Sequence, residues 1–491
     1  MTGSTYAALA DEMDRLLQTI EAGAASVAGR WDGWIEAPDF APSAANLAAY
    51  LALRHHDLRD LQRRCMAAGL SSLGRAESRV MPTLRAVLGL LQAASGTPSA
   101  APQPEDAFFA GEARIAARAE ALLGPLSPES PVRLMVTLPS EAADDAGFLS
   151  RLAGLGVEAV RINAAHDNEA AWGRMIDHVD AAAQATGRRM KVMIDLPGPK
   201  IRSGAIRGGK APGRVLPGET LALARPGKLD RVPRGLAAME CTLSQALAAA
   251  APGQRVFIDD GKLGCTVLRA EDWGLLLRID CGPTEKGYKL KPEKGINFPD
   301  TEIRVPALTD DDRDILRFAA ARADGIEFSF VQEAADVAAL QEALAALRPD
   351  DWRRLGLVLK VETARAVRNL PDMVVRAAGR QPTAIMIARG DLAVEIGFAR
   401  LAEMQEEILW IGEAAQVPVI WATQVMESYL KTGVPSRGDM TDAAMAARAE
   451  CVMLNKGPYL FEGIAELDRL VRRMNGHIAK KTHWMRPLNS W

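Results

Sequence analysis

The sequence predicts an α/β protein built on a (β/α)8 (TIM) barrel, with a small β lid domain inserted after the third strand and an α-helical N-terminal extension. Three observations lead to this fold class. Eight short apolar runs alternate with helix-like segments, a long stretch of short β-type segments interrupts the alternation once, and residues 1 to about 95 follow helical spacing. Eight alternating units favour a closed parallel sheet covered by helices.

The N-terminal region, residues 1–130, is expected to be an α-helical extension followed by a linker. Its clearest helical pattern is the recurrence of Leu47, Leu51, Leu58 and Leu61 at three-, four- and seven-residue steps. The stretch "ASGTPSAAPQPED" then reads as a linker because it is rich in Pro, Ala and Gly.

The barrel is expected to occupy residues 131–202 and 299–491. Its helices follow most of the strands, and Thr309 is placed to cap one of them, "DDRDILRFAAARA". The eight candidate strands are 132–138, 157–165, 191–196, 325–331, 355–362, 384–392, 417–424 and 451–456.

The insertion, residues 203–298, contains "GRVLPGETLALAR", "QRVFIDDGKLGCTVL" and "WGLLLRIDCG", short alternating segments separated by Gly, Pro and Asp-Asp-Gly turns. It leaves the barrel from a loop that follows a strand. Barrel active sites lie on that face, so the inserted domain is placed to act as a lid.

Composition favours small-molecule chemistry. The formal charge is −3, with 59 basic and 62 acidic residues, which gives no electrostatic reason to expect nucleic acid or an anionic membrane as a partner. The five cysteines are scattered without disulfide or metal-ligand spacing and read as free thiols. With no export signal or long apolar segment, we expect a cytoplasmic protein.

Polar side chains gather where the predicted strands end, and such residues meet at one mouth of a barrel. Lys360 and Glu362 are two apart on a strand, so both point to the same face. Glu362 and Asp391 offer two hard oxygen ligands of the kind that suit Mg²⁺. The cations around them indicate an anionic, phosphorylated substrate. The full set is Arg161, Asn163, Asp195, Lys200, Arg202, Lys360, Glu362, Asp391, Thr423 and Gln424.

Each of these residues also has an ordinary structural interpretation. Asp391 alone could cap a turn or a helix, Lys360 alone could extend to water, and Thr423 alone says nothing. His166, the histidine beside the expected mouth, is as compatible with a packed loop as with binding. The convergence of several residues favours a functional interpretation.

In their order along the chain, several motifs resemble those of the pyruvate kinase family, over about residues 130 to 475. The resemblance implies a barrel interrupted after its third strand by a lid domain. It also implies magnesium-dependent transfer of the phosphoryl group of phosphoenolpyruvate to ADP, which gives pyruvate and ATP. The motifs are "VRINAAH", "MIDLPGPKIRSG", "FIDDGKLG", "EKGINFPDTEIRVPALTDDDRDILRFA", "FSFVQEAADVAAL", "LVLKVETARAVRNL", "IARGDLAVEI", "VPVIWATQVMESYLKTGVPSRGDMTDAAMA" and "CVML".

The resemblance also implies roles for single residues. Lys360, assisted by Arg161, would neutralise charge on the transferring phosphoryl group, and Thr423 would take part in protonating the enolate. Glu362 and Asp391 would hold Mg²⁺, with Mn²⁺ as an alternative metal. The residues expected on the substrate and nucleotide side are Asn163, His166, Arg202 and Gly390.

The chain departs from the family pattern at the monovalent-cation site. The family's Ser and Thr ligands are replaced by Ala165 and Leu196, and a glutamate is replaced by Lys200. A lysine ammonium would act as a surrogate for potassium, so we expect activity without K⁺. A second departure, "NKGPYL" at residues 455–460 in place of Ser-Gly-Glu-Thr, puts the nucleotide side in doubt. The family's C-terminal effector domain is expected to be absent.

Two other functions stay open at this point. Metal-dependent lyases and aldolases of pyruvate or oxaloacetate also place Glu and Asp ligands on barrel strands and stabilise an enolate. A non-catalytic partner protein, binding through its N-terminal helices, would tolerate the altered 455–460 segment. The barrel or the N-terminal helices are the candidate surfaces for a homo-oligomer.

Overall fold

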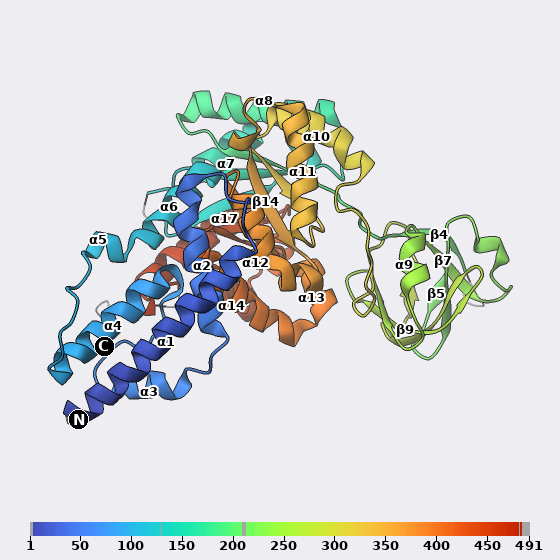
Figure 1. Cartoon of the computed structure of the whole chain (residues 1–491). Coiled ribbons are helices and arrows are strands. Elements are labelled where there is room, and N and C mark those ends of the chain that lie inside the picture. Colours follow the sequence, from blue (N-terminus) through green and yellow to red (C-terminus); the bar gives the residue numbers. More distant parts are fainter. Residues whose placement is uncertain (1–2, 129, 209–212, 481, 484–491) are drawn as a thin grey trace.

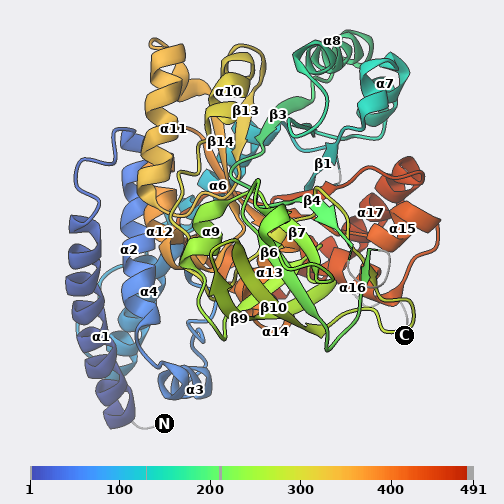
Figure 2. The same cartoon turned by 90° about the vertical axis from the view of Figure 1, so that its right-hand side faces the viewer.

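A closed parallel barrel forms the centre of the computed structural model, which describes residues 3–128, 130–208, 213–480 and 482–483. The (β/α)8 barrel, the inserted β domain and the N-terminal helices are confirmed (Figures 1 and 2). The strands around the barrel are β1 (Arg133–Thr137), β17 (Cys451–Leu454), β16 (Val419–Ala422), β15 (Thr383–Ala388), β14 (Gly356–Val361), β13 (Gly325–Phe328), β3 (Lys191–Leu196) and β2 (Ala159–Asn163).

Helices surround the barrel, and several of them begin at a side chain that caps them. Thr309 makes the predicted cap of α10, in a reciprocal capping box with Asp312. Asp312 also accepts a hydrogen bond from the backbone N–H of Gly198 at 3.1 Å, which fixes the loop after β3. The helices are α7 (Ala146–Gly154), α8 (Glu169–Thr186), α10 (Asp310–Arg322), α11 (Ala334–Leu347), α12 (Ala364–Ala378), α13 (Arg389–Ile396), α14 (Phe398–Ala414), α15 (Glu427–Thr432), α16 (Arg437–Ala446) and α17 (Leu460–Asn475).

Most strands end earlier than the sequence suggested. The prediction of a strand over 384–392 is wrong at its C-terminal end, because β15 stops at Ala388 and Arg389 begins helix α13 directly. The predicted runs 325–331, 417–424 and 451–456 also include loop residues beyond β13, β16 and β17. These extra residues lie at the mouth of the barrel, beyond the hydrogen-bonded ends of the strands, and they include polar side chains of the candidate site.

The inserted domain follows β3 and contains a seven-stranded sheet in the order β12-β8-β9-β10-β6-β7-β4. It stands to one side of the barrel (Figure 1). Asn297 donates to Glu395 of α13 at 3.1 Å, so the return strand contacts the barrel mouth. The elements are β4 (Ser203–Arg207), β5 (Arg214–Val215), β6 (Thr220–Ala224), β7 (Ala237–Cys241), α9 (Ser244–Ala249), β8 (Arg255–Ile258), β9 (Leu263–Glu271), β10 (Gly274–Cys281), β11 (Tyr288–Lys289) and β12 (Ile296–Asn297).

The N-terminal helices pack on the side of the barrel away from the inserted domain (Figure 1). The last of them closes the barrel floor, because Leu122 and Leu123 join the apolar cluster inside the strands. A Cβ on Gly356 would lie 2.1 Å from Leu122 Cδ1, so the glycine makes room for this leucine. The helices are α1 (Gly3–Gly29), α2 (Ala41–Arg54), α3 (Arg59–Ala67), α4 (Val80–Ser95), α5 (Glu105–Phe108) and α6 (Ala110–Leu123).

The cysteines and the helices bear on two further expectations from the sequence, free thiols and the absence of a membrane-spanning segment. All five cysteines are free thiols, and Cys281 is exposed. Among the described helices, none combines the length and the apolar character that a membrane crossing requires.

Candidate active site

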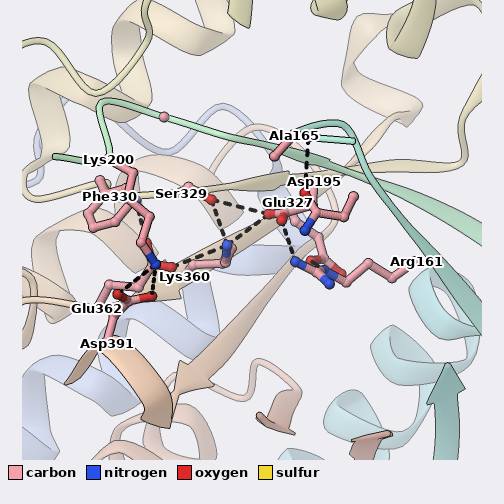
Figure 3. A network of polar contacts seen from close by, with 12 residues as sticks. Arg161, Ala165, Asp195, Lys200, Glu327, Ser329, Phe330, Lys360, Glu362 and Asp391 are labelled. Atoms are coloured by element: carbon pink, nitrogen blue, oxygen red, sulfur yellow. Dashed lines mark hydrogen bonds and ion pairs between the residues drawn. The ribbon is translucent and has the colours of Figure 1, made fainter. Parts of the chain in front are cut away.

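The centre of the barrel mouth is a buried lysine held by three side chains. Lys360 Nζ, near the end of β14, donates to Asp195 Oδ1 at 2.8 Å and to Ser329 Oγ at 2.6 Å. It also lies 3.2 Å from Glu362 Oε1. Because Ser329 donates to Asp195 Oδ1 at 3.1 Å, the ammonium sits in a network that fixes its position (Figure 3).

A buried arginine extends this network toward β2. Arg161 donates from Nε to Glu327 Oε2 at 2.9 Å and from Nη1 to Thr137 Oγ1 at 3.1 Å, and it pairs with Asp195. The barrel register explains the grouping, since Glu327 of β13 lies beside Asp195 of β3. Arg161 is therefore oriented by three neighbours from three strands.

Burial and charge pull the pKa values of this cluster in opposite directions. Burial would raise the pKa of Asp195, but Arg161 and Lys360 outweigh it and hold the pKa below the usual value. Burial would lower the pKa of Lys360, yet the carboxylates of Asp195 and Glu362 keep it raised. Burial raises the pKa of Glu327 to about 7, against the opposing effect of Arg161. Lys360 is therefore a permanent cation, while Glu327 is poised to titrate.

Glu362 and Asp391 form the second part of the site. Glu362 Oε2 accepts the backbone N–H of Phe330 at 2.6 Å, and burial raises its pKa although Lys360 opposes this. Asp391 receives Lys200 Nζ at 2.9 Å and 3.1 Å. The predicted potassium surrogate thus lies against a predicted metal ligand, and both side chains point toward Glu362 (Figure 3).

This pair of carboxylates fits a divalent cation that takes its other ligands from substrate and water. Mg²⁺ is commonly bound through one or two carboxylates. Within the described residues no cluster of three or more His, Cys, Asp or Glu residues is arranged to hold a metal. A carboxylate has about four lone-pair positions, so Asp391 can accept Lys200 and still offer oxygen to a metal.

Thr423 lies on the loop after β16, beside the start of α13. Its Oγ1 accepts the backbone N–H of Gly390 at 2.8 Å, which leaves the hydroxyl proton free to donate. Arg389 holds the loop by donating to the carbonyls of Ala422 at 3.1 Å and Thr423 at 2.5 Å. Thr423 has a φ of +63°, a left-handed conformation rare in β-branched residues, so the structure enforces this hydroxyl position.

Two cavities open beside the network. One, of about 290 Å³, is lined by Arg161, Asn163 and His166 together with Lys456 of the altered segment. The other, of about 280 Å³, is lined by Lys200 and Asp391 at the junction with the inserted domain. The two cavities therefore offer separate binding sites for two reactants.

Of the residues predicted on the substrate and nucleotide side, Asn163 and His166 line the first cavity, whereas Arg202 and Gly390 line neither. Arg202 donates to the carbonyl of Glu293 at 3.1 Å and pairs through its backbone with Gly295, so it braces the base of the inserted domain. Asn163 uses its Oδ1 to accept the backbone N–H of Ala165 at 3.0 Å. His166 lines the first cavity, while its carbonyl accepts Trp172 Nε1 at 2.9 Å.

Sequence reasoning missed Glu327, Ser329 and Thr137. Glu327 and Ser329 are two apart on and just after β13, so both face the barrel interior. An acidic residue inside an otherwise apolar strand was the signal that could have revealed Glu327. Thr137 carried no comparable signal.

Comparison with known proteins gives a consistent result. Residues 130–459 match the family model described as the pyruvate kinase barrel domain. The chain belongs to the pyruvate kinase family. It is 31% identical to a pyruvate kinase of Corynebacterium efficiens over 72% of each chain, and 30% identical to one of Methylorubrum extorquens over 70% of this chain and 68% of that one.

Structural comparison agrees with the sequence matches. A crystal structure of a pyruvate kinase from Cryptosporidium parvum aligns with a TM-score of 0.63 and 26% identity, over 73% of each chain. The chain is therefore a pyruvate kinase-type enzyme. The part of the chain outside the family match includes the six N-terminal helices α1 to α6.

Proposed function

We propose that this pyruvate kinase-type enzyme transfers the phosphoryl group of phosphoenolpyruvate to ADP, with magnesium and without a need for potassium. The observation that carries the proposal is the buried Lys360, fixed between Asp195, Ser329 and Glu362 with Arg161 beside it. Two fixed cations at the base of an open mouth suit a reaction in which charge shifts among phosphoryl oxygens.

In this reaction an oxygen of the ADP β-phosphate attacks phosphorus, and the bond from phosphorus to the enol oxygen breaks. The electron pair of that bond stays on the departing enolate. Lys360 and Arg161 neutralise the phosphoryl oxygens during transfer, and their networks keep them from reorganising. A proton then reaches the enolate carbon and completes pyruvate, with the Thr423 hydroxyl as the positioned donor or as the anchor of a donating water.

Glu362 and Asp391 would hold Mg²⁺, or Mn²⁺ in its place, and the metal would supply a divalent charge that binds the substrate's oxygens. Lys200 is the proposed replacement for potassium. Its ammonium lies against Asp391, whereas Ala165 and Leu196 offer no side-chain oxygen that could ligate a monovalent cation. We expect the reaction in the cytoplasm, where an exposed thiol such as that of Cys281 stays reduced.

The test is pyruvate formation from phosphoenolpyruvate and ADP, measured in potassium and in tetramethylammonium, with magnesium and with a chelator. We expect equal turnover in the two monovalent cations and loss of turnover on chelation. Lys200→Met should lower turnover in tetramethylammonium more than in potassium, while Lys286→Met, at an exposed position of the inserted domain, should change neither.

The outcomes separate the parts of the proposal. Turnover only with potassium would keep the kinase reaction and remove the role of Lys200. Turnover that persists in the chelator would show that the reaction does not require a divalent metal. No ATP under any condition would overturn the kinase reaction for this chain.

A further inference from the structure

A cavity of about 800 Å³ lies at the opposite end of the barrel from the candidate active site. Helices α4, α5 and α6 form one wall. The other wall contains Arg133, the first residue of β1, and Glu450, which immediately precedes β17. The cavity thus lies between the N-terminal helices and the N-terminal ends of β1 and β17.

The helical wall contains an apolar patch that the chain leaves incompletely covered. Leu90 of α4 is 58% exposed and Phe109 is 39% exposed, although both line the cavity together with Val87 and Ile115. A volume of this size is typical of sites that take a small organic molecule. An apolar ligand body would cover side chains that the chain itself leaves open to water.

The floor of the cavity contains a buried arginine that makes no direct ion pair within the described residues. Arg133 is 7% exposed, and its Nε donates to the carbonyl of Gly124 at 2.6 Å. Its two terminal nitrogens form no hydrogen bond or ion pair with any residue that the structure describes. Burial lowers the pKa of this guanidinium, and the nearby Cys451 together with the carboxylates of Glu158, Glu450 and Glu120 offsets this only in part. A buried charge left in this way is costly unless a ligand pairs with it.

Of the other cations that line the cavity, Arg75 is exposed to water and three are paired. Arg79 pairs with Glu112, Arg448 with Glu406, and Lys480 with Glu450. Arg133 is therefore the buried guanidinium that remains available. A buried hydroxyl is also unsatisfied, because Thr83, 6% exposed, has an Oγ1 without a partner among the described residues.

The charge balance limits the ligand. Five carboxylates also line the cavity, so a ligand with two or more negative charges would face repulsion; they belong to Glu77, Glu112, Glu120, Glu413 and Glu450. We propose that this cavity binds a small amphiphilic monoanion, a carboxylate on an apolar body, with the carboxylate paired to Arg133 and the body against Leu90 and Phe109. The site would tie the N-terminal helices to the barrel floor.

The cavity can be tested by direct binding, which does not depend on phosphoryl transfer. Isothermal titration of the full chain with decanoate should give saturable binding, at least tenfold tighter than binding of uncharged 1-decanol. Ala116→Trp should fill the cavity and weaken decanoate binding at least tenfold, since Ala116 is an exposed residue of the lining. Ala117→Trp is the matched control, because Ala117 is also exposed on α6 but does not line the cavity.

Arg133→Gln tests the charge separately and should also weaken decanoate binding at least tenfold while leaving 1-decanol unchanged. Ala116→Trp keeps the test decisive if Arg133→Gln fails to fold. Equal binding of decanoate and 1-decanol, equal weakening by the two tryptophan variants, or no saturable binding to the parent chain would each overturn the proposal.

Discussion

Glu327 offers the sharpest test of the electrostatics at the barrel mouth. Its side chain is fully buried, one oxygen accepts Arg161 Nε at 2.9 Å, and the other has no partner among the described residues. Glu327→Gln keeps the size and the acceptor for Arg161 but cannot ionise. The variant therefore isolates the cost of burying this carboxylate.

The magnitude follows from the pKa, which burial raises from 4.5 to about 7. Each pKa unit is worth about 1.4 kcal/mol, so the ionised carboxylate costs roughly 3 kcal/mol of unfolding free energy. Between these pH values the folded chain keeps a proton that the unfolded chain has lost. Stability therefore falls as pH rises, and the loss is complete above pH 7. The unfolding free energy of Glu327→Gln relative to the parent should rise by about 2.5 kcal/mol from pH 5 to pH 8.

The assay is denaturant unfolding of both chains at four pH values between 5 and 8, followed by tryptophan fluorescence and by circular dichroism. Comparing variant with parent cancels the titration of all other groups. Glu342→Gln, at an exposed position of α11, is the control and should stay parallel to the parent. The reasoning fails if Glu327→Gln is also parallel to the parent, or if it loses relative stability at pH 8.

Three further outcomes follow from the contacts described. Lys360→Met should lower the rate of pyruvate formation roughly a hundred- to a thousandfold while leaving the circular dichroism spectrum unchanged; full activity would remove Lys360 from the reaction. Thr423→Val loses the acceptor for the N–H of Gly390 and the donated proton, so its turnover should fall well below that of Thr423→Ser, and equal rates would contradict this role. Leu123→Ala opens a cavity in the barrel floor and should cost about 2–5 kcal/mol in denaturant unfolding, whereas a change under about 1 kcal/mol would show that α6 does not close the barrel.

Strand positions were predictable because strands of a parallel barrel are buried on both faces and appear as continuous apolar runs. The C-terminal ends of these strands were not predictable, as the stretch 384–392 illustrates. Leu392 is apolar like the strand before it, yet it belongs to α13, and its burial comes from helix packing. Hydrophobicity alone does not distinguish a strand that continues from a helix that starts at once.

The candidate site was predictable where a side chain's direction follows from its strand. Lys360 and Glu362 face one side because of the two-residue period, and the structure places their charged atoms 3.2 Å apart. The contact between Lys200 and Asp391 joins residues 191 positions apart, and no local pattern specifies it. Arg202 illustrates the reverse case, because its neighbours in the sequence suggested the mouth whereas its contacts lie in the inserted domain.

The charges around Lys360 also bear on why a metal would be needed. With Glu327 protonated, the cluster of Figure 3 contains as many cationic as anionic side chains. The cations are Arg161, Lys200 and Lys360, and the anions are Asp195, Glu362 and Asp391. The side chains alone are therefore close to electrically neutral.

A phosphorylated carboxylate brings several negative charges into this mouth. A divalent cation on Glu362 and Asp391 would restore the balance, so we expect phosphoenolpyruvate to bind much more weakly without magnesium than with it. Equal affinity in a chelator, measured by titration calorimetry, would mean that another source of positive charge, such as movement of the inserted domain, serves the substrate.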